Sequence, residues 1–410
     1  SGRRGGRGAS PATAVRRRVS RTRLRRGRVT AVRAGHEANQ GVQVRAAVLE
    51  EIGQGLVIRD DVEVEEPHVG EVAVRVAYCG VCHSDLTTAD GLVPSATPSV
   101  LGHEAAGVVE ALGPGVTGLE VGDHVVLTPC APCGRCPWCI RGEWTQCVSG
   151  DALYTSSHPD GGTRLSRGGE TVYRGLAVAA FAETVIIDQR GAIKIPQDMP
   201  LDVACVVGCA VQTGVGAVLN TAQVQEGDSV LVMGLGGVGL SVVQGARLAG
   251  AGRIIVADPV AERRERALTM GATDAFDPLT DDLVAASMDL STDHIGVDWA
   301  FDAAGRSDLI NIGLAATRKG GTTVMVGVPA LDDPLTIALP ALMAFSGRNL
   351  RGCLLGSCNS IRDIPRFIAL AQAGKLDLEG LITSTRPLAD INAAFDDLRT
   401  ATGVRTVIEV

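Results

Sequence analysis

The chain has 410 residues, enough for two domains with substantial cores. Apolar residues make up 45% and aromatic residues only 3%, so we expect cores built from Val, Ala, Leu and Ile. No apolar run approaches the roughly 20 residues that span a membrane, which argues against a membrane-spanning chain.

The net charge of −8 conceals two unlike parts of the chain. Residues 1–45 contain thirteen arginines, no lysine and one acidic residue, Glu37, which leaves a net charge of −20 for the remainder. This tail fits three interpretations: an arm that binds nucleic acid, an organelle transit peptide, or a disordered extension without a function. The composition favours the third, and we expect ordered sequence to begin near the strand-like run 44–49.

Residues 46–128 predict a β-rich, barrel-like domain. Short β-prone runs are separated by Gly and Pro, and the run 71–76 alternates polar and apolar residues as a half-buried strand does. A second β-prone run covers 124–127. The Gly-Gly pairs within 148–180 indicate an exposed excursion.

Four cysteines fall within fifteen residues, in the order C-x2-C-x2-C-x7-C: Cys133, Cys136, Cys139 and Cys147. This spacing suits a closed tetrahedral zinc site, which needs four soft ligands. Unrelated thiols or two disulfides are the alternatives. The lobe 129–147 has few apolar residues to pack, so we expect a structural zinc to fix it. Eleven cysteines without an apolar signal sequence are more typical of metal ligands than of disulfides, and favour the cytoplasm.

A second set of possible ligands is scattered over 128 positions: Cys82, His103 and Cys209. Three such ligands leave a fourth position free, as a catalytic zinc does. Asp85 could hold the other ring nitrogen of His103 and fix its tautomer. Glu104 could lie near the metal as an outer neighbour or an exchangeable ligand. Taken alone, His103 could equally be a packed core histidine.

From about residue 211 the pattern changes to alternating strands and helices. Such alternation predicts a parallel sheet that is covered on both faces. The expected strands are 229–233, 253–257, 297–302 and 322–328, and the expected helices include 240–248 and 261–270.

A glycine fingerprint, G-x-G-x-x-G, stands between the first of these strands and the first helix. We expect its residues to hold a dinucleotide pyrophosphate at the helix N-terminus. Asp258 ends the next strand, where a carboxylate accepts hydrogen bonds from ribose hydroxyls and repels a 2′-phosphate. This favours NAD over NADP. The fingerprint residues are Gly234, Gly236, Gly237, Val238 and Gly239.

These motifs resemble those of the zinc-containing medium-chain alcohol dehydrogenases. The resemblance runs from about residue 46 to residue 410 and includes CGVCHSD, GHEAAGVV, the cysteine lobe, GCAVQTG, VMGLGGVGLS and GVRTVIEV. It implies an α/β fold with a GroES-like catalytic domain and a doubly wound Rossmann domain. The implied ranges are 46–210 for the catalytic domain, 211–354 for the NAD-binding domain and 355–410 for a return to the catalytic domain.

The resemblance also implies roles for single residues. Cys82, His103 and Cys209 would bind catalytic zinc and the four lobe cysteines structural zinc, so each subunit would hold two zinc ions. Ser84 would touch the substrate oxygen and receive its proton. The implied cofactor contacts are His83 and Arg405, at the pyrophosphate, and Thr213, Arg263, Val326 and Val328.

Two positions depart from the family pattern. Many relatives have a histidine at the end of the proton relay where this chain has Thr87, so we expect the relay to finish in water. Relatives that act on glutathione adducts have an arginine where this chain has Asp151, which argues against that substrate.

The excursion 148–180, together with segments 324–328 and 350–355, resembles the mostly dimeric branch of the family. We therefore expect a homodimer, with a tetramer as the alternative.

The sequence thus predicts a zinc-dependent oxidoreductase that interconverts an alcohol and an aldehyde or ketone with hydride transfer to or from NAD. The substrate could instead be an aromatic alcohol or a thiol–formaldehyde adduct. A zinc-ribbon protein that binds nucleic acid would explain the lobe and the tail, but it would leave the fingerprint unexplained. A body with a charge of −20 would also repel phosphate. A zinc-free reductase is disfavoured by the full ligand set.

Overall fold

The computed structural model describes residues 41–337 and 340–410. The arginine-rich tail lies outside these residues, apart from its last five positions, where the first strand begins. Its three interpretations therefore stay predictions.

Two sheets share one apolar core in the first part of the chain. A six-stranded sheet has the order β8-β7-β2-β1-β4-β9, and a seven-stranded sheet has the order β11-β6-β5-β3-β19-β18 with β10 also paired to β3. The strands of the first sheet are β1 (Val42–Leu49), β2 (Val57–Val64), β4 (Ser99–Val100), β7 (Leu165–Arg167), β8 (Glu170–Thr171) and β9 (Tyr173–Arg174). Those of the second are β3 (Glu71–Gly80), β5 (Glu104–Leu112), β6 (His124–Leu127), β10 (Thr184–Asp188), β11 (Ala192–Lys194), β18 (Ser384–Pro387) and β19 (Thr406–Glu409). The short helices here are α1 (His83–Ala89), α2 (Pro137–Ile140) and α3 (Ala152–Thr155).

The C-terminal strand β19 returns to this part and pairs with the end of β3. Val407 lies opposite Gly80 and Ile408 opposite Cys79, in antiparallel register. The backbone N–H of Val81 donates to the carbonyl of Thr406 at 2.9 Å. This pairing brings residues from opposite ends of the chain to the site described below.

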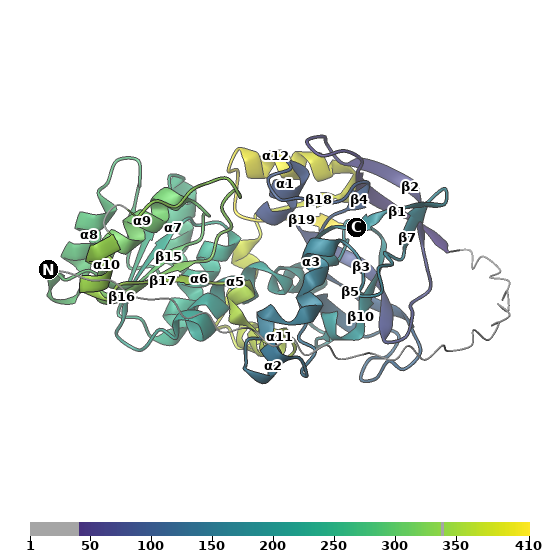
Figure 1. The fold of residues 1–410 in the computed structure, drawn as a ribbon, viewed down its shortest axis with the longest axis horizontal. Helices are drawn as coiled ribbons and strands as arrows, with labels where there is room; N and C mark the ends of the chain where they lie inside the picture. Colours follow the sequence, from purple (N-terminus) through teal and green to yellow (C-terminus); the bar gives the residue numbers. More distant parts are fainter. Residues whose placement is uncertain (1–40, 338–339) are drawn as a thin grey trace, which may run out of the picture. The chain divides into compact units, whose positions relative to one another are not determined.

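A third, wholly parallel sheet has the order β14-β13-β12-β15-β16-β17, and Figure 1 shows helices α6 to α10 around it. Side chains of β12 alternate between two apolar clusters, with Val230 and Val232 in one and Leu231 and Met233 in the other. Both faces of the sheet are therefore covered, as a doubly wound fold requires. The strands are β12 (Ser229–Met233), β13 (Arg253–Ala257), β14 (Asp274–Phe276), β15 (Val297–Asp302), β16 (Thr317–Met325) and β17 (Asn349–Gly352). The helices are α6 (Gly237–Ala249), α7 (Ala261–Met270), α8 (Leu283–Leu290), α9 (Ser307–Ala316) and α10 (Pro340–Ser346).

The fourth expected strand, 322–328, differs from β16, which begins at Thr317 and ends at Met325. The chain turns after Met325 because the N–H groups of Val326 and Gly327 both donate to the carbonyl of Asp302, at 2.9 and 2.8 Å. The other three expected strands coincide with β12, β13 and β15.

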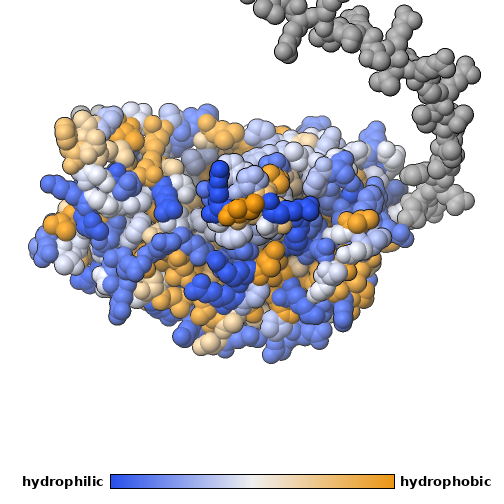
Figure 2. All heavy atoms as spheres, turned by 60° about the horizontal axis from the view of Figure 1, so that its bottom comes forward, coloured by the Kyte–Doolittle hydropathy of each residue, from blue (hydrophilic) through white to orange (hydrophobic). Residues whose placement is uncertain are grey.

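Helical segments connect the two parts in both directions. They are α4 (Leu201–Ala204), α5 (Ala210–Gly216) with a π-helical turn (Ala217–Ala222), and α11 (Ser360–Gln372). A further helix, α12 (Ile391–Arg399), lies between β18 and β19. Among the described residues no single helix is long and apolar enough to cross a membrane; one pair, Leu201–Gly208 with Ala210–Ala222, passes the test of length and composition but is bent by 52°. On the face drawn in Figure 2, hydrophilic and hydrophobic residues are interspersed.

The expectation that 148–180 is an exposed excursion is wrong. Strand β7 pairs with β2, β9 pairs with β4, and Val172 is fully buried. One buried ion pair and one buried histidine fix this segment to β3. The Glu71 carboxylate accepts from Nε and Nη2 of Arg164 at 3.0 and 2.9 Å, and lies 3.1 Å from Nδ1 of His158. Burial, together with the charges of Arg174 and Arg164, lowers the pKa of His158 to about 2, so this imidazole stays neutral.

Replacing Arg164 with Met should destabilise the fold strongly, because the Glu71 carboxylate would stay buried without its guanidinium partner. Losing one partner of a buried pair costs about 3–5 kcal/mol. Arg45→Met is the matched control: its pair with Asp60 is exposed to water, so its loss should change stability little. Thermal unfolding of both variants measures the difference, and equal stability would contradict the anchoring role of Glu71.

Candidate active site and metal centres

Three predicted ligands from distant segments meet in one buried cluster. Cys82 precedes α1, His103 precedes β5, and Cys209 lies between the 3-10 helix Cys205–Gly208 and α5. Their ligand atoms all lie within 4.8 Å of one another, and all three residues are buried. Two thiols and an imidazole around one point form a donor set that suits zinc with a fourth position open.

The Asp85 carboxylate ties two of these ligands together. Its Oδ2 accepts from the backbone N–H of Cys82 at 3.1 Å, and its Oδ1 accepts from the N–H of Gly102 at 2.9 Å and lies 3.2 Å from Nδ1 of His103. Asp85 is fully buried. Although burial opposes charging of the ring, the carboxylate raises the pKa of His103 well above its ordinary value. With Nδ1 engaged, Nε2 is left as the ligating nitrogen.

Gly102 is required for the approach of the His103 loop. Its φ of +90° lies in the left-handed region, and a Cβ there would come within 2.7 Å of the Phe181 backbone nitrogen. The first position of the motif Gly-His-Glu therefore requires glycine.

Ser84 and Glu104 border the cluster. Ser84 Oγ lies 3.8 Å from Cys82 Sγ. The buried Glu104 carboxylate lies 3.3 Å from Nε of Arg405 and, within the described residues, neither of its oxygens makes a hydrogen bond. Burial raises the pKa of Glu104 to about 8 against the opposing charge of Arg405. A metal ion at the cluster would add positive charge here and favour the ionised carboxylate.

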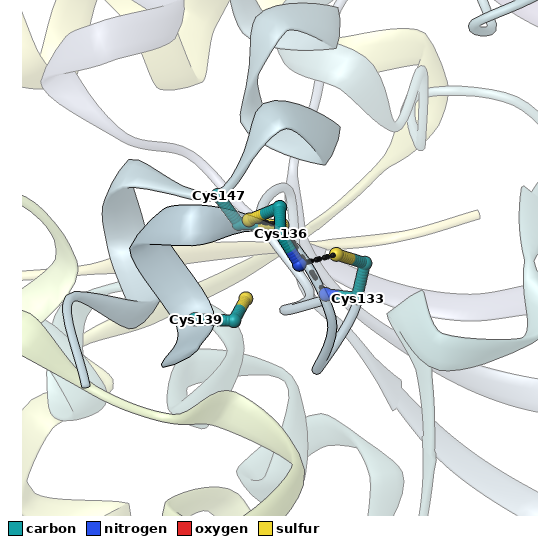
Figure 3. A group of neighbouring side chains, drawn as sticks. All are labelled: Cys133, Cys136, Cys139 and Cys147. Carbon is teal, nitrogen blue, oxygen red and sulfur yellow. Dashed lines mark hydrogen bonds between the residues drawn. The ribbon is translucent and has the colours of Figure 1, made fainter. Parts of the chain in front are cut away.

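The four lobe cysteines form a second cluster, and Figure 3 shows their sulfur atoms facing one another. Backbone N–H groups point at the sulfurs: that of Cys133 donates to Cys147 at 3.2 Å, and that of Cys136 donates to Cys133 at 3.3 Å. Such donors stabilise thiolates, and backbone N–H groups lower the pKa of Cys136 to about 6.

The spacing of the lobe sulfurs fits zinc. Four sulfurs at the usual Zn–S distance of 2.3 Å form a tetrahedron with edges of about 3.8 Å. The sulfurs of Cys136 and Cys147 are 3.8 Å apart, and all four lie within 4.8 Å of one another. All eleven cysteines of the chain fall within the described residues and are free thiols, so the disulfide alternative finds no support.

The glycine fingerprint opens α6 in the way that a pyrophosphate site needs. Gly234 has φ +88°, and a Cβ at Gly239 would collide with the carbonyl of Gly234. At Gly236, by contrast, no described atom lies within 4 Å of the Cβ position, so space is left for a ligand above the helix N-terminus. The residues present therefore fit a dinucleotide.

Positive groups gather beside this helix end. A Cβ on Gly237 would come within 2.5 Å of Nη2 of Arg405, so Arg405 lies directly against the fingerprint. Removal from water and the positive charges of Arg405 and Arg263 lower the pKa of His83. The Arg263 guanidinium also donates to the carbonyls of Gly403 and Ala401, at 2.8 and 3.0 Å, and so holds the C-terminal loop.

Asp258 follows β13 with both carboxylate oxygens already in use. Oδ2 accepts from the N–H of Leu235 at 2.7 Å, and Oδ1 accepts from the N–H of Val260 at 2.8 Å. The side chain thus fixes the fingerprint loop, and its role toward a ribose stays a prediction. The neighbouring Arg264 is held by Asp277 at 3.2 Å.

The remaining predicted cofactor contacts lie on two segments. Thr213 is in α5, one turn after Cys209, and its N–H donates to the Cys209 carbonyl at 2.9 Å. Val326 is buried and Val328 is 62% exposed, both in the turn after β16. The structure therefore puts Thr213 close to the cysteine cluster and leaves Val328 the more accessible of the two valines.

Sequence reasoning missed an apolar wall beside the ligand cluster. Cys130 and Leu355 are buried with Cys82 and Cys209, and two further leucines, Leu153 and Leu354, pack against them. These residues come from the segments after β6, around α3 and after β17. Single apolar residues in short segments carry no periodic signal, so their convergence appears only in the fold.

Two known protein families match separate ranges of this chain. The Alcohol dehydrogenase GroES-like domain family matches residues 68–197, and the Zinc-binding dehydrogenase family matches residues 237–373. An S-(hydroxymethyl)glutathione dehydrogenase from Synechocystis is 37% identical over 367 residues, which cover 89% of this chain and 99% of the relative. The chain belongs to the zinc-containing alcohol dehydrogenase family.

Solved structures agree with this assignment. An alcohol dehydrogenase zinc-binding domain protein from Burkholderia ambifaria has a TM-score of 0.85 and 35% identity, covering 90% of this chain and 99% of the other. Benzyl alcohol dehydrogenase from Acinetobacter calcoaceticus has a TM-score of 0.84 and 31% identity, with the same coverage. The predicted family, fold class and enzyme class are confirmed: this zinc-containing alcohol dehydrogenase is a zinc- and nicotinamide-dependent oxidoreductase of the CH–OH group.

The two metal centres of this alcohol dehydrogenase should respond differently to loss of one thiol. Cys209→Ser should retain about one of two zinc ions, keep NAD binding and lose turnover. Cys136→Ser should lower the melting temperature strongly or aggregate, because structural zinc contributes directly to folding. Zinc analysis and thermal unfolding measure both effects.

Cys205→Ser is the control for this pair, because Cys205 is a buried thiol four residues before Cys209 and lies in neither cluster. It should keep two zinc ions and its activity. Near-normal turnover in Cys209→Ser would overturn the assignment of that cluster.

Asp258→Asn should weaken NAD use about tenfold or more, since a charge-assisted hydrogen bond to the ribose contributes about 1.5–3 kcal/mol. The gain in NADP use should be small, because Arg263 and Arg264 are already held by other partners. The ratio of kcat/KM for the two cofactors is the measurement. A variant that prefers NADP would show that these arginines are free to bind the phosphate.

Proposed function

We propose that Cys82, His103 and Cys209 hold the catalytic zinc and that the four lobe cysteines hold the structural zinc. The observation that carries this proposal is the convergence of three buried ligands, from segments 82–209, within 4.8 Å of one another. Catalysis would take place between this cluster and the fingerprint, because Arg405 contacts both Glu104 at one and Gly237 at the other.

In the proposed reaction, each residue has a separate task. Bound zinc would act as a Lewis acid on the substrate oxygen, and bound NAD would accept the hydride. Ser84 takes the hydroxyl proton, since its Oγ is next to the cluster. Thr87 cannot replace a relay histidine, because its hydroxyl does not titrate near neutral pH and donates to the Ser84 carbonyl at 3.1 Å. The proton that Ser84 receives would therefore leave to water, as Ser84 releases its own hydroxyl proton.

Cofactor preference follows from charge in this proposal. His83 and Arg405 bind the pyrophosphate at the N-terminus of α6, where free N–H groups add to the attraction. Asp258 accepts from the ribose hydroxyls and repels a 2′-phosphate. The enzyme therefore prefers NAD to NADP.

The substrate in this proposal is an alcohol with an apolar or aromatic group. The wall formed by Cys130, Leu153, Leu354 and Leu355 offers no charge to a polar substrate. A thiol–formaldehyde adduct is the second candidate, because the similar Synechocystis protein is named for one. Asp151, which is exposed near this wall, disfavours an adduct with carboxylates.

The proposed assembly is a homodimer in the cytoplasm. Strand β17 is the edge of the parallel sheet, and Phe345, just before it, is 87% exposed. A second copy would cover both, with a tetramer as the alternative state. Thiolate ligands favour a reducing compartment.

A panel of ethanol, benzyl alcohol and thiol–formaldehyde adducts, read as NADH formation at about 340 nm, would test the substrate class. The aromatic alcohol should have the highest kcat/KM.

Ser84→Ala should lower kcat about 10²–10⁴-fold, the usual range for a lost proton acceptor, while zinc content and NAD binding persist. Thr87→Ala, on the same helix, is the control and should change kcat little. Equal losses in both variants would contradict the role of Ser84.

A further inference from the structure

The helical run that carries Cys209 is interrupted at that residue. One helix ends at Gly208 and α5 begins at Ala210, while Cys209 itself has φ −136° and ψ −72°. The break leaves the Gly208 carbonyl in need of a donor. That donor is the Nε2 group of the Gln212 side chain.

The Gln212 carboxamide is also part of a closed ring of hydrogen bonds. Its Nε2 donates to Oγ1 of Thr128 at 3.1 Å, Thr128 Oγ1 donates to Oγ of Ser360 at 3.3 Å, and Ser360 Oγ donates to Oε1 of Gln212 at 2.9 Å. Gln212, Thr128 and Ser360 are all at most 2% exposed. Buried rings of this kind are rigid, since each member polarises the next.

The ring joins three segments that border the cluster. Thr128 directly follows β6, Gln212 lies in the first turn of α5, and Ser360 begins α11. Gly208 also lies tightly against the first of these segments, because a Cβ there would collide with the carbonyl of Leu127. The backbone on the N-terminal side of Cys209 is thereby held from two directions.

We propose that Gln212 is the positioning residue for Cys209. By holding the Gly208 carbonyl and anchoring it to β6 and α11, its carboxamide fixes the helix break and keeps the Cys209 thiol directed toward Cys82 and His103. Gln212 does not touch the metal. The inference rests on the proposed role of Cys209 as a metal ligand.

The test compares Gln212→Met with Gln244→Met. Gln244 is an equally buried glutamine on α6 that makes two hydrogen bonds with the backbone of Asp377, at 3.0 and 2.6 Å. None of these bonds involves a residue next to either cysteine cluster. Both variants should lose similar stability, because each leaves a buried backbone group without its hydrogen-bond partner. Gln212→Met alone should release the catalytic metal faster, by about 10-fold or more, the range for residues that orient metal ligands.

The readouts are release of zinc into a chromogenic chelator and the visible absorption of the cobalt-substituted enzyme. In Gln212→Met we expect faster release of one metal ion, an altered cobalt spectrum, and unchanged release of the structural ion. Wild-type release kinetics and an unchanged spectrum would overturn the inference and leave the proposed function intact. A wild-type enzyme that binds no metal at this cluster would instead overturn the proposed function.

Ser360→Ala provides a second measurement should Gln212→Met fail to fold. It removes the donor to Oε1 of Gln212 and the acceptor of Thr128, and so opens the ring, but it keeps the bond from Gln212 to Gly208. Release of the metal ion from the Cys82, His103 and Cys209 cluster should then be faster than in the wild type. Release at the wild-type rate would contradict the role of the ring.

Discussion

One buried carboxylate, Asp85, connects the parts of the candidate active site. It binds the backbone N–H groups of Cys82 and Gly102 and faces the ring of His103. A buried carboxylate is costly unless it is hydrogen-bonded, so Asp85 holds the loops that carry Cys82 and His103 against each other. The positions of Ser84, one residue before Asp85, and of Glu104, one residue after His103, follow from it.

The pairing of the C-terminal strand brings Arg405 between the cysteine cluster and the glycine fingerprint. Because β19 pairs with the end of β3, Arg405 donates to the carbonyl of Val81, pairs with Glu104 and lies against Gly237. A single guanidinium thus borders both the cysteine cluster and the nucleotide fingerprint. Neither half of the site would be complete without the last few residues of the chain.

Features that depend on local spacing could be predicted from the sequence, and those that depend on distant pairing could not. The lobe cysteines and the fingerprint lie within short segments, so their spacing alone indicates a tetrahedral site and a phosphate-binding turn. The pattern left His103 ambiguous until the family resemblance was considered. The burial of 148–180 escaped prediction because it depends on Glu71, 93 positions from Arg164. The apolar wall and the Gln212 ring likewise join segments that lie far apart in the sequence.

The central claim is that this alcohol dehydrogenase carries zinc at the Cys82, His103 and Cys209 cluster as well as at the lobe. An anomalous difference map, recorded from crystals of the purified enzyme on both sides of the zinc absorption edge, tests it most directly. The account predicts two peaks per subunit, one within each cysteine cluster. A peak at the lobe alone, with none between Cys82, His103 and Cys209, would contradict it.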